Sequence, residues 1–258
     1  MKNRAVFLIV PSLLLMMISF IYPITYIVVN SFKKSTFDGS FAGIYNYIQV
    51  LNNEYFRMAM QNTLKFTLVS VFLTMLFAVL TALILSGISL RISFVKAFFI
   101  IPYLLPSSLI TSVWNYMCPE APRFLSLVCL FVAKNIGIVI LLLLSSLGEV
   151  SIELIDAAKI DGAKKMKLVT KVYLPSISPT ILFTFLLTLA ASASIYRESL
   201  LLYGNYPGDD IYMIQNYLNN HFIKMNYQNI STASVIYTVL LFFVALFALY
   251  AERRYSND

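Results

Sequence analysis

The chain has 258 residues, of which 59% are hydrophobic and only 12% are charged. An average soluble domain has roughly 45–50% apolar and about 25% charged residues, so this composition excludes an ordinary water-soluble protein. The net charge of +7 does not indicate nucleic-acid binding, because the basic residues are dispersed between apolar runs and form no stripe with interleaved aromatic residues. The composition predicts a membrane protein, with lipid as its main contact and no nucleic-acid partner.

Apolar runs recur along the chain at the length that a membrane span requires, about 20 helical residues for a hydrocarbon layer of about 30 Å. The first run follows Lys2 and Arg4 and is longer than the core of a cleaved signal, about 7–15 residues, so we predict a retained helix. No hydrophilic block is long enough for a soluble domain, which predicts a single membrane domain over residues 1–258. The predicted spans are residues 7–29, 64–85, 98–117, 125–147, 177–195 and 233–250.

The distribution of basic residues predicts the orientation of these spans. Short loops rich in Lys and Arg stay cytoplasmic, and an inside N-terminus places more than half of the basic residues on the inner side. An even number of spans returns the C-terminus to that side. We therefore expect both termini and the polar loop 149–175 in the cytoplasm, with segments 31–63 and 196–230 facing outward.

The cysteines and the single histidine indicate no metal chemistry. Cys118 and Cys129 have neither the spacing of a disulfide framework nor that of paired zinc ligands, and we interpret them as apolar fillers. His221 has no Cys or acidic neighbour at metal-ligand spacing. We predict no metal site and assign His221 no chemistry.

Between the predicted fourth and fifth spans lies a polar island, "DAAKIDGAKKMKLVTKVYLP", residues 156–175. Asp156 is expected to accept hydrogen bonds from the free N–H groups at a helix start, and the two alanines that follow it are strong helix formers with little bulk. Gly162 adopts backbone angles closed to other residues, so we expect the chain to turn there. The island therefore predicts two short helices around Gly162.

The second of these helices is predicted to be amphipathic and to end at Pro175, because the residue before a proline is disfavoured in the helical region. Its apolar stripe comprises Met166, Val169 and Tyr173, and its basic stripe comprises Lys164, Lys167 and Lys171. Such a helix also suits a position on anionic lipid headgroups with no protein partner. Periodicity alone leaves a lipid role and a protein-docking role open.

The identity of the residues favours protein docking. "DAAKIDGA", residues 156–163, followed by Leu174-Pro175, resembles the EAA loop of ABC importer permeases, whose usual form is E-A-A-x-x-D-G-A and then a hydrophobic-Pro pair. Five of the six specified loop positions match, and Asp156 stands where Glu is usual. The resemblance implies that residues Asp156, Ala157, Ala158, Asp161, Gly162 and Ala163 couple the chain to an ATPase.

Three more segments are similar to the carbohydrate-uptake branch of that family, so that the resemblance covers about residues 5 to 250. They are "FAGIYNYIQVLNNEYFRMAMQNTLKFT", "AFFIIPYLLPSSLITSVW" and "YRESLLLYGNYPGDDIYMIQNYLNNHF". The resemblance implies an all-α polytopic membrane fold of about six transmembrane helices with a cytoplasmic coupling helix. It also implies import of a carbohydrate, with an oligosaccharide as the expected form, across the plasma membrane of a prokaryote.

The partners implied by the resemblance are a second homologous permease, two copies of a cytoplasmic ATPase and an extracellular solute-binding protein. The chain has no G-x-x-x-x-G-K-[ST] phosphate loop, so ATP and Mg²⁺ are expected on the ATPase, and we predict neither a cofactor nor enzymatic activity for this chain. The alternatives are an importer of this type for another solute such as a polyamine, a non-transporting assembly subunit, and a membrane enzyme. An enzyme is disfavoured because paired intramembrane aspartates or a His cluster are not evident.

Candidate residues for the substrate path are polar or aromatic groups in or near the predicted spans. A lysine near mid-membrane costs about 2.5–3.5 kcal/mol on insertion scales, so Lys134 either faces a cavity or marks the outer border of its span, and we favour the border. Aromatic residues such as Tyr103 mark the headgroup belt or stack on sugar rings. The path candidates are Trp114, Asn115, Lys134, Asn135 and Tyr196.

The Tyr- and Asn-rich outer loop is the candidate docking surface for a solute-binding protein. Its candidate residues are Tyr203, Asn205, Tyr206 and Tyr212. Just before them, Arg197 and Glu198 contact either that protein or each other, and we favour a contact with each other.

Overall fold

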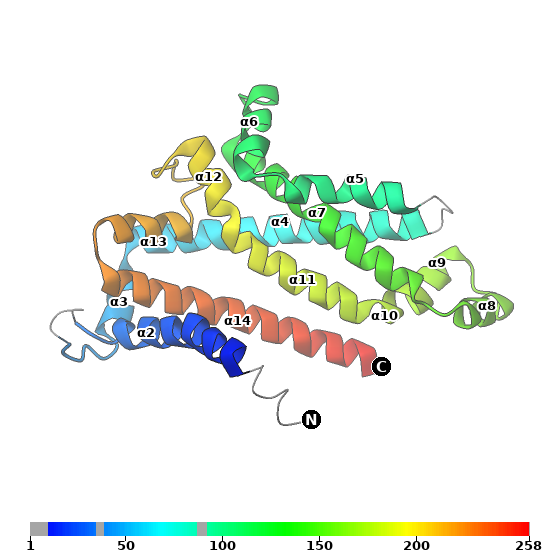
Figure 1. Ribbon diagram of the computed structural model, residues 1–258, viewed down its shortest axis with the longest axis horizontal. Helices are drawn as coiled ribbons and strands as arrows, with labels where there is room; N and C mark the ends of the chain where they lie inside the picture. The colour runs from blue at the N-terminus through cyan, green and yellow to red at the C-terminus, as the bar shows by residue number, and fades with distance from the viewer. Residues whose placement is uncertain (1–9, 35–38, 87–91, 258) are drawn as a thin grey trace. The chain divides into compact units, whose positions relative to one another are not determined.

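A computed structural model of the protein describes residues 10–34, 39–86 and 92–257 (Figure 1). The first residues of the predicted span 7–29 therefore lie outside the described residues. Helices joined by turns and loops make up the described residues, whose one strand-like pairing is an isolated antiparallel bridge between Lys33 and Phe41. The prediction of an all-α fold is confirmed.

Five described helical stretches are long and apolar enough to cross a membrane, and a sixth candidate is a bent pair of helices. The five are Val10–Ser31, Glu54–Ser86, Arg123–Gly148, Ser178–Tyr203 and Tyr227–Arg254. This agrees with the prediction of about six spans. The helices extend beyond the predicted apolar runs, because helix ends follow local capping as well as hydrophobicity.

Two asparagines illustrate this difference at the starts of long helices. Helix α4 (Glu54–Ser86) begins ten residues before the predicted span because the Asn53 side chain accepts a hydrogen bond from the Phe56 N–H at 3.0 Å. Helix α14 (Tyr227–Asn257) begins where the Asn226 side chain accepts from the Asn229 N–H at 3.3 Å. In both cases the capping residue lies in sequence that is too polar to be read as a span.

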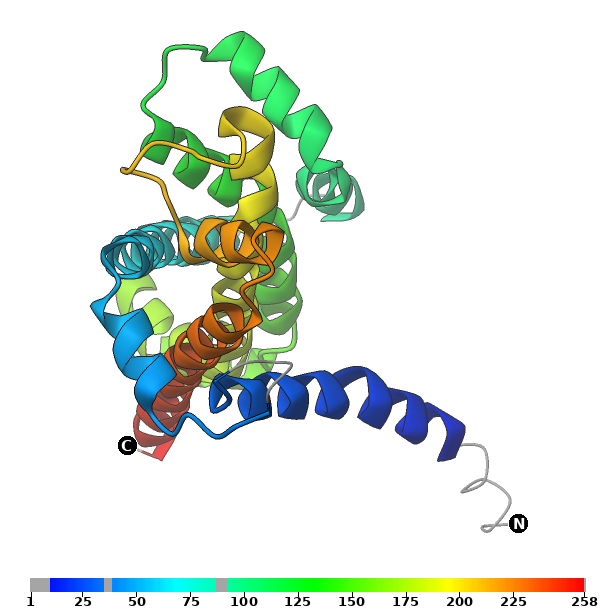
Figure 2. The same ribbon diagram turned by 90° about the vertical axis from the view of Figure 1, so that its left-hand side faces the viewer.

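The predicted span 98–117 coincides with the bent pair of helices, α5 (Ile92–Leu104) and α6 (Ser107–Met117), with a bend of 103° between Phe98–Leu104 and Ser107–Met117. Leu105 leaves the helix because the residue before a proline is disfavoured in the helical region. Pro106 has extended backbone angles and leads into α6. In Figure 2, α5 is seen nearly end-on whereas α6 lies across the view.

The chain divides into two compact units. One unit comprises residues 1–60 and 214–242, and in its described part contains η1 (Met17–Ile21), α2 (Tyr22–Ser31), α3 (Tyr45–Asn52), α13 (Ile214–Ile223) and the first parts of α4 and α14. The Asn46 side chain holds α3 against the end of α2, because its amide donates to the carbonyl oxygens of Ser31 and Lys33 at 2.8 Å each. The rings of Phe56 and Tyr217 meet edge to face at 5.5 Å between centroids.

The second unit comprises residues 61–213 and 243–258, and contains the candidate sites. Its described helices are the rest of α4 and α14, α5, α6, α7 (Arg123–Gly148), α8 (Ile152–Ile160), α9 (Lys165–Leu168), η2 (Val169–Tyr173), α10 (Leu174–Ser176), α11 (Ser178–Ser192), η3 (Ala193–Ile195) and α12 (Tyr196–Tyr203). Helices α5 and α7 pack closely, because Gly137 on α7 lies directly against the backbone of Phe99 on α5. Buried apolar side chains of α4, α7 and α11 complete the core.

Candidate functional site

The polar island forms an elbow that we call the α8–α9 loop, residues 151–176, beyond the ends of α7 and α11 (Figure 1). Helix α8 starts at Ser151, whose side-chain oxygen accepts a hydrogen bond from the Leu154 N–H at 3.2 Å. The prediction that Asp156 caps a helix start is wrong, because Asp156 lies within α8. Its carboxylate instead forms an exposed ion pair with Lys159 at 2.9 Å.

The predicted turn at Gly162 is confirmed. Gly162 has a φ of +79°, in the left-handed region that favours glycine. The Ala163 N–H donates to the Ala158 carbonyl at 2.9 Å and the Gly162 N–H to the Lys159 carbonyl at 3.0 Å, which is the Schellman arrangement at a helix end. These bonds fix the angle at which the chain leaves α8.

The α8–α9 loop presents large apolar side chains to its surroundings. Ile160 is 86% exposed, Met166 is 74% exposed and Ile152 is 72% exposed. They lie outside the membrane-length helices, and the small Ala157 side chain between them is also exposed. Exposed apolar side chains of this kind suit contact with a partner protein or with lipid headgroups, the two roles that periodicity leaves open.

The second helix of the loop does not end at Pro175 as predicted, because the helical run continues to Ser176 and breaks at Ile177. Before the proline the chain forms a π-turn, in which the Leu174 N–H donates to the Val169 carbonyl five residues back. This wider turn accommodates Pro175, which has no N–H and whose ring would clash with the carbonyl four residues earlier in a regular α-helix. The predicted basic stripe is exposed, whereas Val169 and Tyr173 are half-buried.

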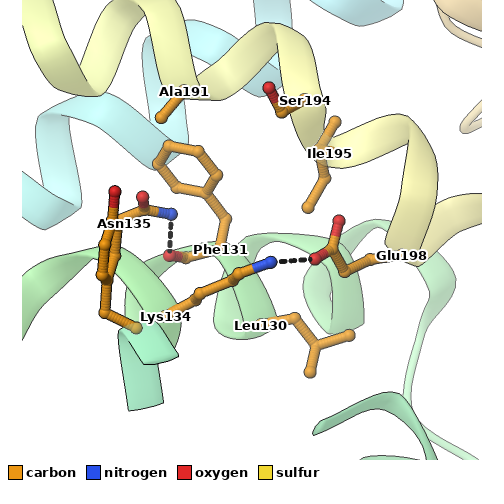
Figure 3. A pocket seen from close by; sticks show the side chains of 9 residues that line it. Leu130, Phe131, Lys134, Asn135, Ala191, Ser194, Ile195 and Glu198 are labelled. Carbon is orange, nitrogen blue, oxygen red and sulfur yellow. Dashed lines mark hydrogen bonds and ion pairs between the residues drawn. The ribbon is translucent and has the colours of Figure 1, made fainter. Parts of the chain in front are cut away.

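The second candidate site is a cavity of about 330 Å³ within the second unit (Figure 3). It lies where α7 faces the end of α11 and the start of α12, with one residue from the end of α5. Its lining residues are Tyr103, Leu130, Phe131, Lys134, Asn135, Ala191, Ser194, Ile195 and Glu198. The wall is mostly apolar and carries a few convergent polar groups, which is typical of a small-molecule site.

Lys134, Glu198 and Ser107 form a closed hydrogen-bonded triangle at this cavity. The Lys134 ammonium lies 2.7 Å from Oε1 of Glu198 and donates to the Ser107 hydroxyl at 2.9 Å. That hydroxyl in turn donates to the same Glu198 oxygen at 2.6 Å. The triangle joins α6, α7 and α12, and Glu198 is only 3% exposed.

This geometry bears on two sequence-based interpretations. Lys134 lies eleven residues inside α7 and lines the cavity, which agrees with the cavity alternative, whereas its depth in the membrane stays a prediction. The favoured contact between Arg197 and Glu198 is wrong, because neighbouring residues on a helix do not face each other. Arg197 is exposed, whereas Glu198 is buried against Lys134.

The cavity brings together only some of the predicted path residues. Asn135 lines it beside Lys134, and the Asn135 amide donates to the Phe131 carbonyl at 2.9 Å. Trp114, Asn115 and Tyr196 are not among the lining residues. Sequence reasoning missed Ser107 and the role of Glu198. The rule that charges inside a membrane usually pair indicates that Lys134 has an acidic partner, but it does not identify which acid.

The outer-loop candidates for docking differ in exposure. Asn205 is exposed and Tyr206 is 68% exposed, so both offer surface to a partner. Tyr203 is half-buried, with the Arg123 guanidinium 6.0 Å from its ring centroid. Tyr212 is buried and offers little side-chain surface, because this stretch folds back into the core beside Ile211 and Met213. Over the described residues, no group of three His, Cys, Asp or Glu side chains is placed to hold a metal ion.

The fold and the two sites define a multi-span membrane protein with a mostly apolar cavity that carries an ion pair, and with an elbow that exposes apolar side chains. The chain belongs to the family described as "binding-protein-dependent transport system inner membrane component", which matches residues 93–257. It is a membrane-spanning transport permease subunit of the ABC importer type.

Curated relatives include the arabinooligosaccharides transport system permease protein AraP of Bacillus subtilis, 27% identical over 96% of this chain and 88% of the relative. The trehalose transport system permease protein SugA of Mycobacterium tuberculosis is 26% identical over 79% of this chain and 74% of the relative. A chain of a bacterial alginate ABC transporter, solved in complex with an alginate pentasaccharide-bound periplasmic protein, has the same fold with a TM-score of 0.78. It is 17% identical and the match covers 99% of this chain and 96% of that chain.

Proposed function

We propose that the chain forms part of the translocation pathway of an ATP-driven importer for a carbohydrate, in the form of an oligosaccharide. Membership of the binding-protein-dependent family carries this proposal. The sugar assignment is supported by relatives named for arabinooligosaccharide and trehalose transport and by the shared fold with an alginate transporter chain. The substrate path of the proposal includes the cavity beside Lys134 and Asn135.

In this proposal the α8–α9 loop docks on a separate ATPase subunit that holds ATP and Mg²⁺. The exposed Ile160 and Met166 side chains supply apolar contact area, and the small Ala157 permits a close approach of the partner surface. Asp161 ends α8 at the same exposed corner and supplies a polar contact. Two ATPase copies that close on ATP draw the loops together, and the spans then shift as packed bodies between inward-open and outward-open states.

The proposed assembly contains a second, homologous permease, two ATPase copies and an extracellular solute-binding protein in the plasma membrane of a prokaryote. The alginate transporter solved with a periplasmic protein supports the binding-protein partner. Both termini and the α8–α9 loop face the cytoplasm, as the concentration of lysines in that loop favours. Asn205 and Tyr206 then lie on the outer side, where the binding protein docks.

Reconstitution tests the proposal. The complete transporter is placed in proteoliposomes with its ATPase, its binding protein and a panel of radiolabelled arabino-, malto- and xylo-oligosaccharides, and uptake is measured with and without ATP. We expect ATP-dependent accumulation of at least one oligosaccharide. Accumulation of a polyamine with no uptake of any sugar would overturn the carbohydrate assignment, and uptake without the ATPase would overturn the coupling.

A further inference from the structure

We infer that Glu198 is a specificity-determining residue that neutralises Lys134 and so restricts the cavity to uncharged saccharides. The inference rests on the proposed carbohydrate function and adds to it the charge class of the substrate. Its physical basis is the triangle of Lys134, Glu198 and Ser107, in which the one cation and the one anion among the described residues that line the cavity are in contact at 2.7 Å.

The two charged groups are not equally accessible from the cavity. The Glu198 side chain is 4% exposed, whereas the Lys134 side chain is 26% exposed. The Glu198 oxygen Oε1 accepts from both Lys134 and Ser107, so this carboxylate is held in place by two donors. A ligand in the cavity therefore approaches the ammonium, with the carboxylate behind it.

Lys134 keeps hydrogen-bonding capacity while its charge is compensated. An ammonium has three N–H donors, and two of them point to Glu198 and Ser107 within the described part of the chain. The third suits an acceptor that carries no charge, such as a saccharide hydroxyl. The Tyr103 ring on the same wall offers an apolar face to a sugar ring.

A carboxylated saccharide is expected to bind this cavity poorly. A carboxylate that moves from water into a mostly apolar cavity loses its hydration, which costs free energy. Its attraction to an ammonium that is already paired with Glu198 offsets little of that cost. The Glu198 carboxylate also repels it. When Glu198 is replaced by Gln, the same ammonium is left uncompensated, and the cavity becomes a site for an anionic sugar.

The test is equilibrium binding to the purified complete transporter without its binding protein, so that the permease alone selects the ligand. The probes are two pairs of trisaccharides that differ in carboxylation at C6: mannotriose with trimannuronate, and galactotriose with trigalacturonate. For the wild type we expect the neutral member to bind at least tenfold more tightly than the uronate. A wild type that prefers the uronates would overturn the inference without any variant.

Glu198→Gln should raise the affinity for a uronate trimer at least tenfold, with a gain that shrinks as salt is added. The double variant K134Q/E198Q should lose that gain, because it has no uncompensated ammonium. Glu120→Gln is the matched control, since it removes an exposed acid outside the cavity and changes the net charge by the same amount.

An assembled Glu198→Gln transporter with no uronate gain would overturn the inference, as would an equal gain in Glu120→Gln or in the double variant. These outcomes are distinct from a failure of the proposed function. If no trisaccharide, neutral or carboxylated, binds to the wild type or to any variant, the carbohydrate assignment fails and the inference fails with it, whereas neutral binding without a uronate gain in Glu198→Gln overturns the inference alone.

Discussion

Gly137 on α7 is a residue at which the backbones of two helices of the second unit lie directly against each other. A Cβ atom built there meets the carbonyl group of Phe99 on α5 at a distance that real structures do not show. Backbone at a helix position cannot move aside as a flexible side chain does. The α5–α7 contact therefore depends on the absence of a side chain at this residue.

Gly137→Ala should destabilise the protein, at the overpacking cost of about 1–3 kcal/mol or more. The measurement is thermal unfolding of the purified chain in detergent. Gly148→Ala is the matched control, because Gly148 is also on α7 and has open space around its Cβ position. That control should be neutral or stabilised by up to about 1 kcal/mol. Equal stability of both variants would contradict the close α5–α7 contact.

His221 on α13 is expected to make stability depend on pH. Burial, and then the neighbouring Lys224 charge, lower the pKa of its imidazole from the ordinary 6.5. Its Nδ1 atom is buried without a hydrogen-bond partner in the described structure, and its ring lies 4.3 Å from that of Tyr217. The folded protein therefore favours the neutral ring.

The sign of the dependence follows from proton binding. Below pH 6.5 His221 binds a proton in the unfolded chain but not in the folded chain. The free energy of unfolding therefore decreases as the pH is lowered from 6.5 to the lowered pKa of the folded state. Below that pKa, His221 causes no further change. Melting temperatures of wild type and His221→Gln at about pH 7.5, 6.5 and 5.5 test this. The wild type should lose more stability on acidification than the variant, and parallel losses would contradict it.

Single residues also show what the sequence could and could not predict at this scale. The turn at Gly162 was predictable, because its cause is local backbone freedom. The partner of Lys134 was not, because Glu198 is 64 residues away in the sequence and only the packing of α7 against α12 brings them together. Ser151 and Asp156 are both residue types that cap helices, so residue type alone does not decide which of them begins α8. The structure shows that Ser151 is the cap.

At the element scale, the α8–α9 loop combines a fixed turn with uncovered apolar side chains. The Schellman bonds at Gly162 hold the direction of the chain after α8, and a residue with a Cβ in the left-handed region costs about 1–2 kcal/mol. No neighbouring atom lies within 4 Å of a Cβ placed at Gly162, so a substitution acts through backbone strain and not through a clash. A substitution at Gly162 is therefore expected to change the geometry of the turn without disturbing the packing of neighbouring side chains.

Gly162→Val should uncouple ATP hydrolysis from transport, because a β-branched residue disfavours the turn that positions the loop. We expect the solute transported per ATP in proteoliposomes to fall several-fold while the transporter still assembles in the membrane. The control is Gly43→Val, which imposes a positive φ of +57° on valine outside the loop. A Gly162→Val transporter with the coupling ratio of the wild type would contradict a mechanical role for the turn.

Helix ends were harder to predict than helix identity. Apolar runs identified the long helices because burial in lipid requires them, whereas their ends depend on caps such as Asn53 and on proline breaks such as Pro106. The π-turn before Pro175 lets that helix continue past the proline, which a propensity argument excludes. These features involve one or two side chains each, and they leave little trace in hydropathy.

For the whole molecule, composition predicted a membrane protein, and the resemblance carried by the polar island and three further segments implied the all-α fold and the family. A chain with 59% hydrophobic residues has few folds open to it, since membrane spans must satisfy every backbone group internally. The cavity was only partly anticipated, because its walls come from α7, α11 and α12, and no sequence period relates them. The single-domain organisation and the cytoplasmic position of both termini stay predictions.

The coupling role proposed for the α8–α9 loop depends on its contact with a cytoplasmic ATPase, and cysteine cross-linking detects such a contact. Ile160→Cys places a thiol at an 86% exposed position in a chain whose Cys118 and Cys129 are replaced by alanine, and Tyr206→Cys in the outer loop serves as the control. In membranes that contain the complete transporter, Ile160→Cys should cross-link to the ATPase subunit, whereas Tyr206→Cys should react with a membrane-impermeant maleimide added outside. Labelling of Ile160→Cys from outside, with no cross-link to the ATPase, would contradict the account.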